Sequence, residues 1–174
     1  MMKRGIYLIT GLMASGKSTV AELLAARQPR GVHLRGDVFR RMIVAGREEM
    51  TEQAGAEALR QLYLRYDLAA CAARAYLEAG FTVMLQDNYY GPALGYMLDR
   101  LSGCPVEVIV LWPDAETVRR REAGRSKTGY TGFSVESLYA SFMRETPRVG
   151  LWLDNSTQTP EETADAICAR FADD

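Results

Sequence analysis

The chain has 174 residues, 48% of them hydrophobic and 25% charged, a composition typical of one soluble globular domain. Its 21 Lys and Arg residues against 22 Asp and Glu give a net charge of −1, so no overall basic field exists to hold nucleic acid, and only a local basic groove is left for that role. The three cysteines lie far apart without a CxxC pair, which argues against a disulfide framework or a zinc site.

Targeting and membrane signals are weak throughout the sequence. The apolar run at residues 5–10 meets a glycine and is shorter than the roughly 7–15 apolar residues of a signal-peptide core. No stretch approaches the ~20 apolar residues of a membrane span. We therefore expect a cytoplasmic protein with no membrane partner, and the sequence leaves its oligomeric state open.

Apolar runs of strand length alternate with segments of helical periodicity along the chain. The expected strands cover residues 5–10, 31–35, 81–86, 106–112 and 151–154. Apolar side chains recur at steps of three and four through residues 50–79, a span that predicts a helix with a break near Gly55. Asp114 and Thr159 are expected N-caps of two later helices. The alternation predicts an α/β fold with a parallel sheet between helices, as one domain over residues 1–174.

The segment GLMASGKS follows the first expected strand and fits the pattern GxxxxGK[ST]. Glycines in such a loop let backbone N–H groups point around an anion, and the helix that follows adds its positive N-terminal end. Lys17 would reach the β- and γ-phosphates, the Ser18 hydroxyl would ligate Mg²⁺, and Thr19 would contact the α-phosphate. The expected nucleotide-binding residues here are Gly11, Ala14, Ser15, Gly16, Lys17, Ser18 and Thr19.

The alternative for this segment is a chance match in a surface turn. Four fixed positions arise by accident in on the order of one in a hundred chains of this size. The position between a buried strand and an apolar-patterned helix is what a phosphate-binding loop requires, so it favours nucleotide binding. A single domain of this size with such a loop near its start, and without a guanine-reading NKxD motif, resembles the nucleoside-monophosphate-kinase branch of P-loop kinases. That resemblance implies a five-stranded parallel sheet of order 2-3-1-4-5, helices on both faces, a short lid over about residues 121–133, and ATP with Mg²⁺ as phosphoryl donor.

The segment HLRGDVFRRMI, residues 33–43, follows the second expected strand. Asp37 would lie at the carboxyl edge of the sheet, where a carboxylate could take the proton of an acceptor hydroxyl. The segment resembles the matching part of chloramphenicol phosphotransferases and polynucleotide kinases, and this resemblance implies that Asp37 is the catalytic base. The structural alternative is that Asp37 is a helix N-cap worth about 0.5–2 kcal/mol. Arg40 is a further candidate for acceptor binding.

The segment QDNYYG, residues 86–91, follows the third expected strand. Asp87 occupies the usual place of a carboxylate that supports Mg²⁺ or binds the acceptor, and the sequence does not decide between these roles. Asn88 and Tyr89 are expected to point into the same cleft. The structural alternative is an ordinary turn, for which Asp-Asn is favourable.

A basic cluster, VRRREAGRSKTGY, covers residues 118–130. Arg121 and Arg125 are four positions apart, and their spacing resembles adenylate-kinase-like lids, in which one Arg packs on adenine and the next reaches the phosphates. The resemblance implies that Arg121 binds the nucleotide and that Arg125 is catalytic. A solvated basic helix end is the structural alternative. The loop after the last strand, with Asn155 and Ser156, is a further candidate for the adenine site.

Together these patterns predict an ATP-dependent phosphotransferase that moves the γ-phosphoryl group to a hydroxyl of a small molecule, with an antibiotic or a related metabolite as one candidate acceptor. A polynucleotide-kinase-like 5′-hydroxyl kinase is an alternative, which the near-neutral charge disfavours. A sugar kinase for carboxylate-bearing acceptors fits less well, because only Arg40 and Arg41 stand nearby to bind the carboxylate. A nucleotide-binding regulatory module without phosphotransfer is the alternative of another class.

Overall fold

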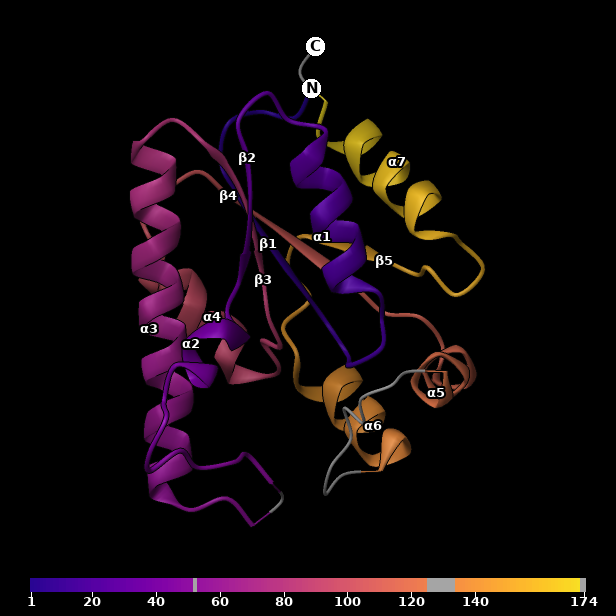
Figure 1. Cartoon of the computed structure of the whole chain (residues 1–174). Helices are drawn as coiled ribbons and strands as arrows, with labels where there is room; N and C mark the ends of the chain where they lie inside the picture. Colours follow the sequence, from indigo (N-terminus) through magenta and orange to yellow (C-terminus); the bar gives the residue numbers. More distant parts are fainter. Residues whose placement is uncertain (52, 125–133, 173–174) are drawn as a thin grey trace.

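The computed structural model describes residues 1–51, 53–124 and 134–172. Its centre is a five-stranded parallel sheet of order β2-β3-β1-β4-β5 (Figure 1). The strands are β1 (Ile6–Gly11), β2 (Gly31–Arg35), β3 (Thr82–Gln86), β4 (Val106–Leu111) and β5 (Leu151–Leu153). The sheet confirms the predicted fold class and strand order, and each expected strand is present within a residue or two at its ends.

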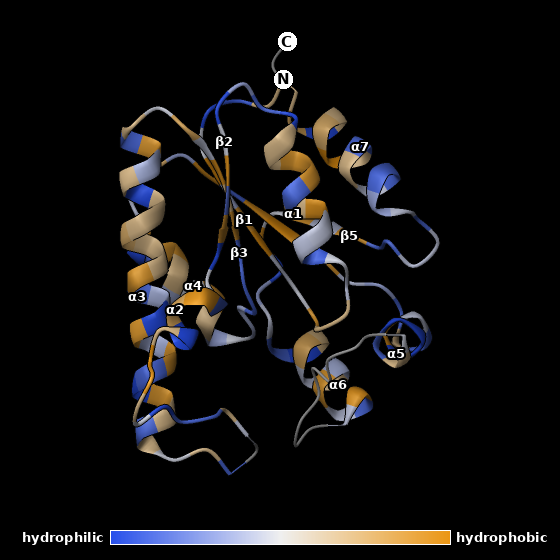
Figure 2. Cartoon of the chain, in the orientation of Figure 1, coloured by the Kyte–Doolittle hydropathy of each residue, from blue (hydrophilic) through white to orange (hydrophobic). Residues whose placement is uncertain are grey.

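Helices cover both faces of this sheet (Figure 1). They are α1 (Lys17–Ala26), α2 (Asp37–Arg41), α3 (Ala56–Glu78), α4 (Pro92–Arg100), α5 (Ala115–Ala123), α6 (Val135–Glu145) and α7 (Pro160–Arg170). Side chains alternate between two core layers: Ile6 and Leu8 of β1 pack in a cluster with α3 and α4, whereas Tyr7 and Ile9 pack with α1 and α7. Figure 2 shows the resulting pattern, with hydrophobic strands in the centre and hydrophilic residues on the outer sides of the helices.

Three expected helix starts can be compared with the structure. The long helix α3 begins directly after Gly55, as the predicted break requires. Asp114 caps α5 by accepting a hydrogen bond from the Thr117 N–H at 2.6 Å, and Thr159 forms a capping box with Glu162 at the start of α7.

The structural alternative for Asp37, a helix N-cap, does not hold. Gly36 holds the N-cap position of α2, Asp37 is the first helical residue, and no side-chain hydrogen bond from the described residues caps this helix. The start of α2 is set instead by the Gly36 N–H, which donates to the Gln86 carbonyl oxygen at 3.0 Å. Asp37 is therefore free of a capping role.

All five strands run in one direction, so their carboxyl ends meet at one edge of the sheet. The segments that follow those ends supply each of the site candidates that the structure describes, because loops at this edge lie close together in an open α/β sheet. None of the helices in the described ranges is long and apolar enough to cross a membrane.

Candidate active site

The loop between β1 and α1 has the backbone of an anion-binding site. Gly11, Ala14 and Gly16 have φ angles of 144°, 65° and 94°, which place three of its residues on the left-handed side. A side chain at Gly11 would put its Cβ 2.2 Å from the Leu111 carbonyl oxygen, so the loop can close against β4 only with glycine there. Such alternation of backbone handedness lets successive N–H groups converge, and the N-terminus of α1 opens directly onto the loop.

Two side chains of α1 stand at the mouth of this loop. Lys17 is buried, and its ammonium group donates to the Leu12 carbonyl oxygen at 2.7 Å. The Ser18 hydroxyl donates to the Gln86 side-chain oxygen at 3.1 Å, which links the first turn of α1 to the end of β3. Thr19, the third candidate of this segment, lies exposed on the first turn of α1.

The side-chain oxygens of Ser18 and Gln86 fit the ligand set of a magnesium ion that is bound together with a nucleotide. Mg²⁺ usually takes one or two protein ligands and completes its octahedron with waters and phosphate oxygens. Ser18 donates its hydrogen to Gln86, which leaves the lone pairs of the hydroxyl for a cation. Within the described ranges, His, Cys, Asp and Glu form no group of three or more that could hold a metal. The Ser18 hydroxyl with Gln86 beside it is thus the arrangement that suits Mg²⁺.

Asp87 follows β3 and is buried in an ion pair. The Arg65 Nε donates to Asp87 Oδ2 at 2.7 Å, and a second nitrogen of the same guanidinium donates to Oδ1. The Asn88 backbone N–H also donates to Oδ1, at 2.7 Å. Burial lowers the pKa of Arg65, but the charge and hydrogen bonds of Asp87, together with the nearby Tyr66 and Tyr89, outweigh burial, so the pKa of Arg65 is raised. Both oxygens of Asp87 are therefore engaged by this chain.

The two residues after Asp87 differ in their surroundings. The Asn88 carbonyl oxygen accepts a hydrogen bond from the Tyr66 hydroxyl at 2.9 Å, and its side chain is half-buried. Tyr89 has no exposed surface, and its ring centre lies 5.1 Å from that of Tyr66 within the core. The expectation that Tyr89 points into the cleft is wrong, because its backbone is fixed by two hydrogen bonds with the Thr10 hydroxyl and its ring faces α3.

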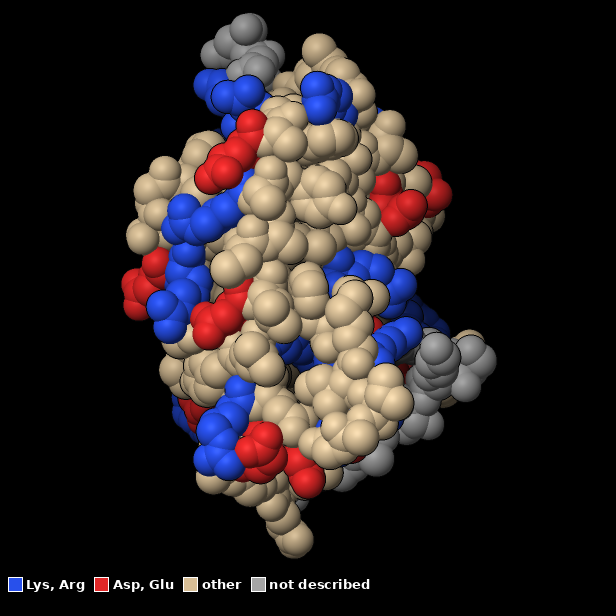
Figure 3. Space-filling view, turned by 60° about the vertical axis from the view of Figure 1, so that its left-hand side comes forward, with Lys and Arg blue, Asp and Glu red and all other residues tan. Residues whose placement is uncertain are grey.

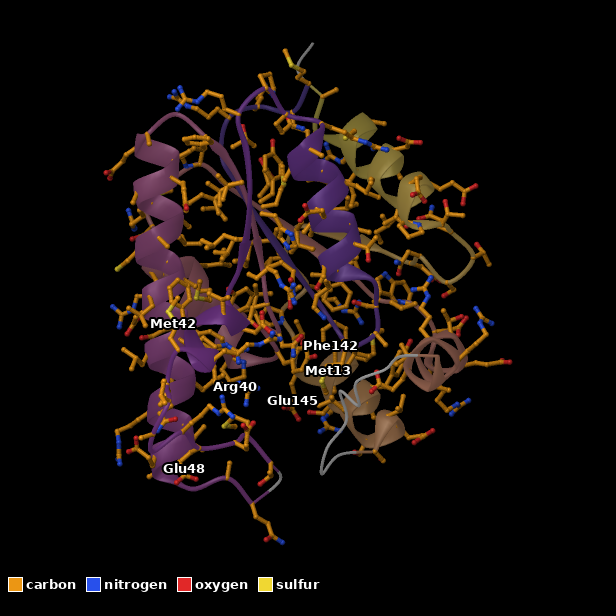
Figure 4. All side chains as sticks on the ribbon, in the orientation of Figure 1. Met13, Arg40, Met42, Glu48, Phe142 and Glu145 are labelled. Carbon is orange, nitrogen blue, oxygen red and sulfur yellow. The ribbon has the colours of Figure 1, made fainter. Side chains whose placement is uncertain are left out.

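Asp37 is held at the edge of the sheet by arginines. Its Oδ2 accepts from the Arg41 guanidinium at 2.6 Å, and Arg35 Nε lies 3.6 Å from Oδ1. The side chain is 31% exposed, so an acceptor hydroxyl can approach it from solvent. Arg40, the neighbouring candidate, forms an ion pair with Glu49. In Figure 4, Arg40 on α2, Met13 in the phosphate loop and Glu145 on α6 lie at this same end of the sheet.

The arginines at this end are matched by carboxylates. Arg35 and Arg41 both stand beside Asp37, Arg40 pairs with Glu49, and Arg65 pairs with Asp87. The face shown in Figure 3 likewise has Lys and Arg interleaved with Asp and Glu along its left-hand side. In this described group, four arginines and three carboxylates are therefore interleaved, and the arginines do not form an isolated positive field.

A hollow lies between α5 and the loop after β5. Its volume is about 450 Å3, and it is lined by Asp114, Glu116, Thr117, Arg120, Arg121, Ser156, Thr157, Gln158 and Thr159. This volume falls within the range of small-molecule sites. Arg121 and Ser156, two residues that the sequence suggests for the adenine site, both line this hollow.

Arg121 and Asn155 connect that hollow to the phosphate loop. The Arg121 guanidinium donates to the Asn155 carbonyl oxygen at 2.9 Å and to the Ser15 carbonyl oxygen at 3.3 Å. The Asn155 side-chain amide donates to the same Ser15 oxygen at 2.9 Å. Burial, and then the charge of Arg120, lower the pKa of Arg121. Arg125, Lys127 and the rest of the expected lid beyond Gly124 lie outside the described residues.

Sequence reasoning missed Arg65 and Gln86. Arg65 stands three positions after Leu62 and one before Tyr66 on a helix face that is otherwise apolar. A charged side chain on such a face needs a buried partner, so the position of Arg65 indicates that it forms a buried ion pair. Gln86 ends a buried strand one residue before Asp87, and its polar side chain there was a weaker signal of the same kind.

The family of the chain follows from comparison of its sequence. Residues 6–146 match the family model AAA_33, which is described as an AAA domain. The chain belongs to this family. No curated protein matches the sequence at a significant level.

Solved structures similar to this AAA domain include several kinases. A sugar kinase from Janibacter sp. HTCC2649 aligns with a TM-score of 0.70 and 19% identity over 98% of this chain and 96% of that chain. The tunicamycin resistance protein of Deinococcus radiodurans gives 0.69 and 16% over 98% and 96%. The APS kinase of Mycobacterium tuberculosis in complex with AMPPNP and APS gives 0.66 and 18% over 97% and 98%. At these identities the likeness establishes a small P-loop kinase-like fold.

Proposed function

We propose that this AAA domain is an ATP-dependent phosphotransferase that moves the γ-phosphoryl group of ATP to a hydroxyl of a small molecule. The observation that carries the proposal is the joint presence of two features at one sheet edge. One is the phosphate loop with Lys17 and Ser18 at its mouth, and the other is the solvent-accessible carboxylate of Asp37. The kinase-like fold supports the same reading.

In this proposal the loop amides, Lys17 and the start of α1 bind the triphosphate, and Arg121 helps to bind the base in the hollow beside α5. Ser18 would hold Mg²⁺, with Gln86 orienting its hydroxyl. When bound, Mg²⁺ neutralises charge on the β- and γ-phosphates. Arg125 is proposed to contact the transferring group.

Asp37 acts as the general base of the transfer. Its carboxylate takes the proton of the acceptor hydroxyl while the acceptor oxygen bonds to the γ-phosphorus. The bond between that phosphorus and the β,γ-bridging oxygen breaks, and ADP leaves. Arg41 and Arg35 keep the carboxylate at the edge of the sheet, where the acceptor arrives. Arg40 and Asn88 remain candidates for the wall of the acceptor site.

The ion pairs at this edge favour an acceptor without a large negative charge. Four arginines there, Arg35, Arg40, Arg41 and Arg65, each contact a carboxylate of the chain, with Arg35 and Arg41 sharing Asp37. A polynucleotide draws most of its affinity from unpaired cations, so the described part of this edge offers it little. We therefore favour a small hydroxyl compound over a 5′-hydroxyl oligonucleotide as the acceptor.

A transfer assay tests this proposal. Purified protein with Mg²⁺-ATP is offered chloramphenicol, aminocyclitols, nucleosides, sugars and a 5′-hydroxyl oligonucleotide, and mass spectrometry looks for added phosphate. Asp37→Asn is expected to reduce the product by about 10²–10⁴-fold, the usual contribution of a general base. Asp99→Asn, a change at an exposed carboxylate on α4, is the control and should retain full activity. An undiminished product in Asp37→Asn would remove Asp37 as the base, and ATP binding without transfer would favour a binding module.

A further inference from the structure

The ion pair between Arg65 and Asp87 has no part in the chemistry just proposed, yet it is the most deeply buried pair in the described ranges. The side chains of Arg65 and Asp87 are 11% and 3% exposed. Burying two charges costs several kcal/mol per ion, and apolar residues of similar size are often as stable. A pair retained in such a place is therefore weak support for stability, so we looked for what the pair holds in position.

Asp87 supports the turn that leads into Asp37. A Cβ placed on Gly36 would lie 2.3 Å from Asp87 Oδ2, so this turn rests directly on the carboxylate. The Gly36 N–H also donates to the Gln86 carbonyl oxygen at 3.0 Å. The position of Asp37, one residue later, is thus set by the end of β3.

The same strand end reaches the phosphate loop on its other side. The Gln86 side chain accepts the hydroxyl hydrogen of Ser18, and the Asp87 backbone N–H donates to the Ile9 carbonyl oxygen at 3.3 Å. The helix α3 fixes this strand end with two neighbouring residues, because Arg65 binds the Asp87 carboxylate and the Tyr66 hydroxyl binds the Asn88 carbonyl oxygen. Residues 86–88 therefore link the phosphate loop to the turn that carries Asp37, the proposed general base.

We propose that Arg65 is a positioning residue of this kinase. By holding Asp87 with two hydrogen bonds, Arg65 fixes the end of β3 under Gly36 and so sets Asp37 relative to Ser18. Asp87 then acts through its contacts with Arg65 and Gly36, and binds neither Mg²⁺ nor the acceptor. The role of Asp37 in this inference rests on the proposed function, whereas the mechanical part rests on the contacts alone.

Three variants test the inference: Arg65→Met, Asp87→Asn and the double variant. Arg74→Met is the matched control, because Arg74 lies on the same helix and its guanidinium donates to the carbonyl oxygens of Arg100 and Ser102 at 2.7 Å, away from the site. The first readout is hydrogen exchange of the Gly36 amide and the α2 amides. The second is the Mg²⁺ concentration that gives half-maximal ATP binding. Neither readout needs an acceptor.

Exchange at the Gly36 and α2 amides should be at least tenfold faster in both single variants and unchanged in Arg74→Met. The double variant should exchange no faster than the faster single variant, because both substitutions break the same contact. The Mg²⁺ midpoint should stay within twofold of wild type in every variant. With an accepted substrate, kcat should fall tenfold or more while the KM for ATP changes less than twofold.

Two results would overturn the inference. Wild-type exchange at Gly36 in Arg65→Met would show that the pair does not hold the turn. A Mg²⁺ midpoint raised tenfold in Asp87→Asn but not in Arg65→Met would make Asp87 a metal ligand. If Arg65→Met does not fold, Arg65→Lys keeps the charge, loses the two-point geometry, and is judged by the same two readouts. Absence of any phosphorylated product would defeat the proposed function and leave both readouts intact.

Discussion

Replacement of Gly36 by alanine adds a single methyl group at the closest approach between α2 and β3. The backbone of Gly36 has φ −62° and ψ −32°, which alanine adopts without strain, so the backbone conformation adds no cost to the substitution. The new Cβ would lie 2.3, 3.0 and 3.1 Å from Oδ2, Cγ and Cβ of Asp87. The whole cost of the change therefore comes from that one neighbour.

The magnitude depends on which partner moves. Asp87 cannot swing aside while Arg65 and the Asn88 N–H hold both of its oxygens. A shift of the turn with the pair kept is an overpacking change, which typically costs about 1–3 kcal/mol. Rupture of the pair would instead expose an uncompensated buried charge, at about 3–5 kcal/mol. We expect the turn to move, with a loss of about 1–3 kcal/mol and a Tm lower by about 2–12 °C.

Urea unfolding of Gly36→Ala against wild type measures this cost. Gly95→Ala is the control, because Gly95 lies inside α4 with nothing within 4 Å of an added Cβ. Alanine there should stabilise the helix by about 0.5–1 kcal/mol. If Gly36→Ala unfolds with the same free energy as wild type, the turn does not rest on Asp87 and the reasoning fails.

Thr159→Ala removes the capping box of α7 and should lower the free energy of unfolding by about 0.5–2 kcal/mol in urea. Burial, and then the Asp87 charge, raise the pKa of Tyr66 above its ordinary value of 10.0, so the folded form keeps its proton longer than the unfolded form does. The contribution of Tyr66 to the free energy of unfolding is complete below pH 10 and declines above it by up to about 1.4 kcal/mol per pH unit. Because Tyr66→Phe lacks the titrating hydroxyl, its free energy of unfolding should decline less steeply between pH 10 and 11 than that of wild type. An equally steep decline in that variant would contradict the assignment. Arg121→Met removes the guanidinium that lines the hollow beside α5 and that we propose contacts the nucleotide. One charge-assisted hydrogen bond to the nucleotide is worth about 1.5–3 kcal/mol, so the ATP dissociation constant should rise about 10–100-fold by calorimetry. Arg119→Met, which loses the exposed ion pair with Glu136, should stay near wild type.

The strands and helices could be predicted from the sequence because the patterns that indicate them are local. Continuous apolar runs marked each strand, and the alternation with helical segments required a parallel sheet. Gly55 marked the start of α3, and Asp114 and Thr159 marked two further helices through caps that need only a few neighbouring residues. The strand order came from the resemblance to P-loop kinases, since no local pattern fixes which strands are neighbours.

The phosphate loop could also be predicted from the sequence, because its glycines and Lys17 act within one short segment of the chain. The residues that contact the site from distant parts of the chain could not be predicted. Ser18 meets Gln86 across 68 positions, and Arg65 meets Asp87 across 22. These contacts arise only when β3 lies beside β1 and α3 packs on that layer, so they depend on the assembled sheet.

One alternative and one prediction fail for the same reason. Asp37 looked like a helix cap because its neighbours along the chain permit one, but Gly36 takes that position where it meets the end of β3. Tyr89 follows two polar residues and so looked like part of a cleft, yet it packs on Tyr66. In both cases a residue distant in sequence decided the outcome.

The most direct measurement follows the γ-phosphate itself. The protein is incubated with Mg²⁺-ATP labelled at the γ-phosphate and with the small-molecule fraction of a cell extract, and the label is traced by chromatography and mass spectrometry. A hydroxyl kinase moves the label into an organic phosphate ester; Lys17→Met should abolish that product, and Asp37→Asn should reduce it by about 10²–10⁴-fold. Label found only in ATP and inorganic phosphate would contradict phosphoryl transfer to a small hydroxyl compound.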